Sequence, residues 1–263
     1  VQTCALPIFS LALVFFYSCN TVDLENISGI DFIPSESHTI LNINDLDTTK
    51  EIFQSNPLIP NIYSESEIIS SRLNDLTIRE SKNGILSLSP YGKDQVAYTF
   101  VSKIVANDSI FQNEKFDHIY QNNNIYSRKI NDETIFMTLI DNFFISSNRD
   151  LIIENIIRDL KSNKKLDSEL LKISKTLDTN EPFNILVRSK DFSNSNFMLR
   201  NISTFPKVKS SWIGYDFQNS LNELKLNGVT RINDSINSRL SLLSNIPPSK
   251  VSSFKIIPDS FKS

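Results

Sequence analysis

Apolar positions change their spacing several times along the chain, between the two-residue period of a strand and the 3.6-residue period of a helix. Short apolar and β-branched runs predict strands, and helical spacing predicts amphipathic helices. The expected strands are 39–44, 85–89, 96–101, 125–130, 134–140, 143–146, 183–188, 212–217 and 223–230. The expected helices are 48–55 with Asp47 or Thr48 as N-cap, 64–76, 148–160, 166–177 and a short one from Asp234.

The connections between expected strands carry residues that favour tight turns. Pro90–Asp94 contains both Pro and Gly and predicts a β-hairpin, and Asp141–Asn142 predicts a two-residue turn. The helix that follows has one apolar side, made of Leu151, Ile152, Ile156, Ile157 and Leu160. Antiparallel hairpins and meanders with amphipathic helices on one face predict an α+β fold. It extends over 31–246, with a sub-boundary near 161–182 that would give two similar halves.

An uncharged apolar run, Phe9 to Tyr17, leads to Ser18 and Cys19. Its length suits the central region of an export signal over 9–18, because spanning a bilayer takes about 20 residues. The stretch resembles the lipobox of bacterial lipoproteins, although Phe16 and Tyr17 depart from the usual residues. The resemblance implies signal cleavage after Ser18, lipidation of Cys19 and a membrane anchor. An ordinary cleaved signal and an apolar helix of the fold are the alternatives.

Segments outside the expected domain have separate interpretations. Residues 1–8 read as the in-frame translation of a sequencing adapter, so they are left out of the fold prediction. Residues 19–30 are polar and acidic and predict a tether. Phe254–Ser260 resembles Ile30–Glu36 in pattern, so 247–263 is expected to begin a truncated repeat, unless the likeness is coincidental.

Composition excludes several classes of protein. The chain has 263 residues, a net charge of −3 and 40% hydrophobic residues, which predicts a folded core and no nucleic-acid partner. Cys4 falls in the adapter-like segment, which leaves Cys19 alone. Neither a disulfide framework nor a cysteine metal site is therefore expected.

Motifs for catalysis are missing from the sequence. His38 is expected at a strand edge and His118 in a polar connection, with no second ligand at a fixed spacing. No phosphate loop or nucleophile elbow is present. We therefore predict no catalytic residue, no metal site and no cofactor. Trp212 and Tyr215 would mark either a ligand face or a buried aromatic pair.

The alternation of strands and helices, the Pro90–Asp94 hairpin and the Asn142–Asp150 transition together resemble a known family. It comprises long, uncharacterised envelope lipoproteins of Bacteroidetes type, in which α+β modules precede a β-propeller. The resemblance covers most of 30–263 and implies that this chain is a fragment of the amino-terminal region. No catalytic residues transfer.

Two functions are compatible with these features. The first is a lipid-anchored, non-enzymatic interaction or scaffold module of the bacterial cell envelope, at the periplasmic face or cell surface, with an unknown protein or envelope partner. The second is a hydrolase acting on an envelope polymer through carboxylates that only the fold brings together. Convergence of Asp, Glu and His side chains in a concave pocket would favour the hydrolase.

Overall fold

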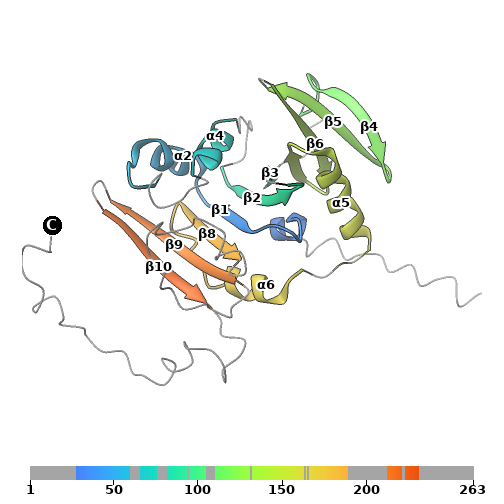
Figure 1. The fold of residues 1–263 in the computed structure, drawn as a ribbon. Helices are drawn as coiled ribbons and strands as arrows, with labels where there is room; N and C mark the ends of the chain where they lie inside the picture. The colour runs from blue at the N-terminus through green and yellow to red at the C-terminus, as the bar shows by residue number, and fades with distance from the viewer. Residues whose placement is uncertain are drawn as a thin grey trace, which may run out of the picture. The chain divides into compact units, whose positions relative to one another are not determined.

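The computed structural model describes residues 28–59, 66–75, 82–93, 95–104, 110–130, 132–162, 164, 166–188, 212–220 and 223–230. Its antiparallel strands and helices confirm the predicted α+β class (Figure 1). The chain divides into two compact units, the first with the described residues of 1–37 and 79–166, and the second with those of 38–78 and 167–263. The signal, Ser18, Cys19, the helix from Asp234 and the 247–263 repeat lie outside the described residues.

The described residues of the first unit form six strands, a short 3-10 helix and one α-helix. These are η2 (Gly29–Phe32), β2 (Gly84–Tyr91), β3 (Gln95–Lys103), β4 (Lys115–Tyr120), β5 (Asn123–Ile130), β6 (Glu133–Ile140), β7 (Phe143–Ser147) and α5 (Asp150–Lys161). The strand order is β2-β3-β7-β6-β5-β4. Strand β4 was not expected from the sequence, and η2 includes Gly29 and Ile30, the last residues of the predicted tether.

Two of the connections in this sheet are two-residue turns with left-handed backbone. Gln121 and Asn122 have φ angles of 46° and 67°, and Asp141 and Asn142 have φ angles of 47° and 66°. Asn and Asp tolerate this conformation better than other residues with a side chain, so they suit hairpins whose twist matches the strands. The Asp141–Asn142 turn is the one that the sequence predicts.

Helix α5 packs on the sheet through four buried isoleucines, Ile152, Ile153, Ile156 and Ile157. Ile153 and Ile157 form a core cluster with Ile125 of β5. The expectation that Leu151 joins this face is wrong, because its side chain is 51% exposed. At 100° per residue, Leu151 lies on the opposite side of the helix from the centre of the isoleucine face.

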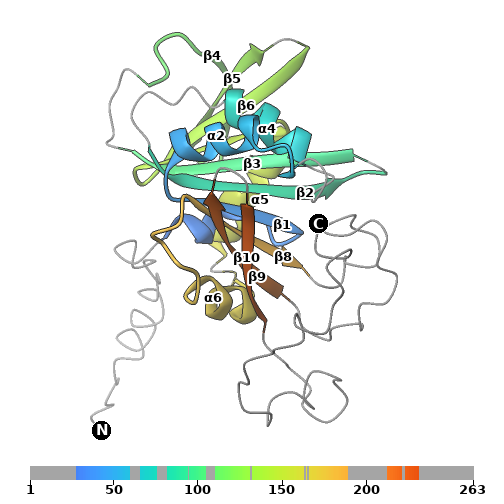
Figure 2. The same ribbon diagram turned by 90° about the vertical axis from the view of Figure 1, so that its left-hand side faces the viewer.

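In the second unit, the part that the structure describes has four strands and three helices. These are β1 (Thr39–Ile43), α2 (Leu46–Ser55), α4 (Ser66–Asp75), α6 (Ser168–Ser174), β8 (Phe183–Arg188), β9 (Trp212–Ser220) and β10 (Glu223–Thr230), with strand order β10-β9-β8-β1 (Figure 2). Asp45 caps α2 by accepting a hydrogen bond from the Thr48 amide, so the expected cap at Asp47 or Thr48 is wrong. Asp45 sits one residue before the first helical position, where its carboxylate can accept from that amide.

A fully buried asparagine joins three strands of this unit. Asn184 of β8 lies opposite Asn42 of β1 and Asp216 of β9. Its side-chain oxygen accepts hydrogen bonds from Asn44 at 3.0 Å and Asn42 at 3.2 Å. Such a polar group is tolerated in a core only when its hydrogen bonds are made.

Candidate functional site

A β-bulge in β4 decides which side chains reach each face of the sheet. Phe116 pairs with Tyr126, and His118 pairs with the next residue along β5, Ile125, so Asp117 is the extra residue. A strand normally alternates its side chains, and one inserted residue resets that alternation. Phe116 and Ile119 therefore share one face, while His118 lies on the other with Ile125, on the side of α5.

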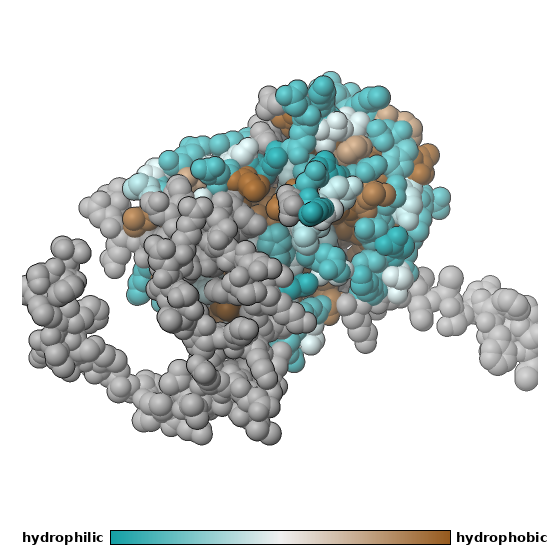
Figure 3. All heavy atoms as spheres, viewed as in Figure 1, coloured by the Kyte–Doolittle hydropathy of each residue, from teal (hydrophilic) through white to brown (hydrophobic). Residues whose placement is uncertain are grey.

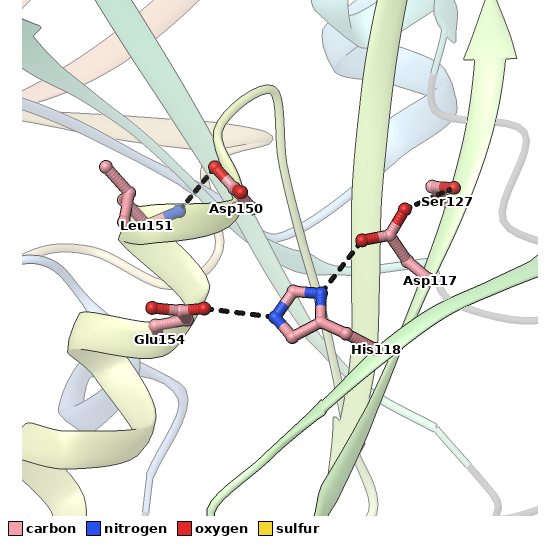
Figure 4. Close-up of polar contacts among 6 residues, drawn as sticks. All are labelled: Asp117, His118, Ser127, Asp150, Leu151 and Glu154. Atoms are coloured by element: carbon pink, nitrogen blue, oxygen red, sulfur yellow. Dashed lines mark hydrogen bonds and ion pairs between the residues drawn. The ribbon is translucent and has the colours of Figure 1, made fainter.

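His118 is held between two carboxylates on this α5 side (Figure 4). Its Nδ1 lies 2.8 Å from Asp117 Oδ2, and its Nε2 lies 3.0 Å from Glu154 Oε1 of α5. The Ser127 hydroxyl donates to the second oxygen of Asp117 at 3.3 Å. The cluster thus connects the edge strand, its neighbour β5 and the helix.

The protonated form of His118 is favoured by this arrangement. The hydrogen bond to Asp117 is the largest influence that raises the pKa of His118 above 6.5; partial burial opposes it, and Glu154 raises it further. In the protonated ring both nitrogens carry hydrogens, and each donates to a carboxylate. No ring nitrogen then has a free lone pair with which to take a proton from a substrate.

Two further contacts attach the same hairpin. Lys161, near the end of α5, donates to the main-chain oxygen of Gln121 in the β4–β5 turn. Arg128 of β5 donates through Nε to Glu114, just before β4, at 2.9 Å. Helix α5 therefore holds the β4–β5 hairpin at two points, and the His118 cluster is one of them.

Of the described residues singled out in the sequence, His118 belongs to this cluster, whereas His38 and Trp212 do not. Ser18 and Cys19 lie outside the described residues, and the main-chain oxygen of His38 accepts from Arg188 in the second unit. Trp212 is 1% exposed and its Nε1 donates to Asp167 at 2.9 Å, so the ligand-face interpretation of Trp212 is wrong. The indole is buried because β9 packs that face against α6.

The Asp117–His118–Glu154 cluster was not expected from the sequence. His118 was predicted to lie in a connection, whereas it belongs to β4, and Glu154 is 36 positions away on a helix. The only local sign of the strand that carries His118 is the mixture of apolar and polar residues over Lys115–Tyr120, directly before the Gln121–Asn122 turn.

Metal binding has no support within the described ranges, where no group of three or more His, Cys, Asp or Glu residues is arranged to hold an ion. Among those same residues, every helix is too short or too polar to cross a bilayer. No family model, curated protein or solved structure matches the chain.

Stability of the first unit is expected to depend on pH through His118. Because its pKa is raised on folding, its stabilising contribution is complete below about pH 6.5 and is lost as the pH rises through the folded-state value. We expect His118→Gln to destabilise the protein more at about pH 6 than at about pH 8.5. Urea unfolding at both values measures this difference, and an equal loss at both would contradict the ionic role.

Proposed function

We propose that this chain is a lipid-anchored protein of a bacterial cell envelope and acts there as a non-enzymatic interaction or scaffold module. The proposed location depends on the apolar run before Ser18 and Cys19. Each buried methylene of an acyl chain contributes about 0.8 kcal/mol, so a doubly or triply acylated cysteine gives a stable anchor.

The engagement of both His118 nitrogens is the observation that favours a non-enzymatic role. Asp117 and Glu154 are each occupied by the same ring, and their side chains are 33% and 22% exposed. A general base needs a free lone pair within reach of its substrate. The cluster is instead suited to fastening β4 to α5.

The hydrolase is the second candidate, and one observation favours it. An Asp, a His and a Glu do converge within hydrogen-bonding distance, which is one of the two features expected of a hydrolytic site, the other being a concave pocket. If this cluster were catalytic, Glu154→Gln would abolish release of soluble fragments from purified envelope polymers. We expect neither the parent protein nor this variant to release fragments above a blank without protein.

Metabolic labelling tests the anchor directly. Cells producing the parent protein, a Cys19→Ser variant or a Cys4→Ser variant would be grown with a fatty-acid analogue and then fractionated. We expect label and membrane association in the parent and in Cys4→Ser, and loss of both in Cys19→Ser. Cys4→Ser is the matched control because it removes the other cysteine of the chain. Label that persists in Cys19→Ser would overturn the proposal.

A further inference from the structure

We propose that two copies of this chain associate through β4, with the two strands antiparallel around a two-fold axis between Asp117 and His118. The inference deepens the proposed role as an interaction module, and rests on it, by naming the partner as a second copy. Three features of β4 support it: its position in the sheet, its exposed apolar side chains and the symmetry of its sequence.

Strand β4 is the last strand in the sheet order, so its outer side has no neighbouring strand among those the structure describes. Its Phe116 is 51% exposed and its Ile119 is 61% exposed. Figure 3 has the same view as Figure 1. Over the region of β4 and α5 it shows hydrophobic residues exposed among hydrophilic ones. Large apolar side chains gathered at one place on a surface mark interaction sites more often than scattered ones do.

Neighbouring rings extend this apolar surface. The Phe116 ring meets Tyr126 edge to face, with centroids 6.1 Å apart, and Tyr126 stacks on Phe111 with centroids 4.3 Å apart. The bulge at Asp117 brings Phe116 and Ile119 to the same face as Tyr126. In a regular strand, residues three apart would point to opposite faces.

The sequence of β4, Lys-Phe-Asp-His-Ile-Tyr, is complementary to its own reverse. An antiparallel pair centred between Asp117 and His118 places Phe116 against Ile119 of the other copy and Asp117 against His118. Centring on Asp117 or on His118 would instead oppose like charges. Two-fold interfaces need a surface that fits itself, and this register provides it for the apolar residues while it keeps like charges apart.

The pair is closed because, in a two-fold arrangement, each β4 edge is covered by the other. The bulge and the terminal Lys discourage regular strand pairing at a sheet edge. Side chains rather than a continuous ladder would therefore carry most of the contact. Stable interfaces bury about 800 Å² per partner, and a patch of a few side chains is smaller, so we expect a weak, concentration-dependent dimer.

Sedimentation of the full chain tests the association. The background carries Cys4→Ser and Cys19→Ser, so that neither native thiol can cross-link, and all samples share one detergent. We expect a monomer–dimer equilibrium, weakened at least tenfold by Phe116→Ser combined with Ile119→Ser. Leu151→Ser is the matched control, since Leu151 is also 51% exposed in the same unit, and should leave association unchanged. Circular dichroism would confirm that each variant folds.

Cross-linking tests the register. Phe116→Cys and Ile119→Cys would be introduced separately into the same background, and each variant oxidised alone and in an equal mixture. We expect a disulfide-linked dimer to form far more readily in the mixture, because the proposed axis places 116 against 119. Equal cross-linking alone and mixed, or none at all, would overturn the register.

Failure of this inference is distinguishable from failure of the proposed function. If the parent protein is labelled at Cys19 but the thiol-free background sediments as a monomer at every concentration, the dimer is overturned and the anchored location stands. A dimer in sedimentation together with no label at Cys19 would overturn the anchored location and leave the dimer standing.

Discussion

Replacing Trp212 with alanine is expected to lower the free energy of unfolding by about 3–5 kcal/mol, the range for truncating a large buried aromatic side chain. The indole is 1% exposed, and the Arg188 guanidinium lies 4.9 Å from its ring centroid. The change would leave a cavity beside α6 and remove the donor that Asp167 accepts. Urea unfolding followed by circular dichroism measures the loss.

The Asp167 carboxylate explains why the indole matters beyond its volume. One oxygen caps α6 by accepting from the Glu169 amide at 2.9 Å, and the other accepts from Trp212 at 2.9 Å. Trp212→Phe keeps an aromatic ring and removes the second bond together with a small part of the buried volume, so we expect a loss of about 1–2 kcal/mol. Equal losses for Phe and Ala would contradict this division between packing and hydrogen bonding.

Strands with apolar faces were predictable from the sequence because their periodicity reflects burial on at least one side. The β2–β3 hairpin and β5 to β9 all follow this rule. Strand β4 does not, because as an edge strand with a bulge it has polar residues on one side and exposed apolar residues on the other. Its pattern has neither the period of a half-buried strand nor the polarity of a loop.

The candidate site was unpredictable for a different reason. Asp117 and His118 are adjacent in the sequence, but the bulge decides that His118 points toward α5. Their partner Glu154 lies on that helix, far away in the sequence. Caps such as Asp167 are local, and the sequence can suggest them. Tertiary pairings such as Trp212 with Asp167 need the fold.

The β-bulge at Asp117 gives β4 two different faces. The extra residue at Asp117 directs charge toward α5, where it is neutralised, and leaves Phe116 and Ile119 on the other face. The contacts of His118 with Asp117 and Glu154 are therefore also the ones that would hold the proposed contact surface in place. Breaking the contacts of His118 with Asp117 and Glu154 should loosen β4 and, with it, weaken self-association.

Asn184→Leu is expected to destabilise the second unit by about 3 kcal/mol, about 1 kcal/mol for each of three polar groups left without a partner. The Asn184 amide donates to the Asp178 main-chain oxygen and to Asp216 Oδ1, both at 2.9 Å. Leucine has the same branching as asparagine but is bulkier, so overpacking at this fully buried position would add to the loss. Asn42 and Asn44 would each retain one donor hydrogen with nothing to bind.

Urea unfolding with fluorescence detection suits this measurement, because Trp212 is the only tryptophan and lies in the same unit. Asn180→Ala is the control, since Asn180 is exposed and bonds only within its own turn to Asp178. We expect that variant to stay within about 0.5 kcal/mol of the parent. A neutral Asn184→Leu would mean that the three strands are held by apolar contacts alone, and that the asparagine cluster adds register without adding stability.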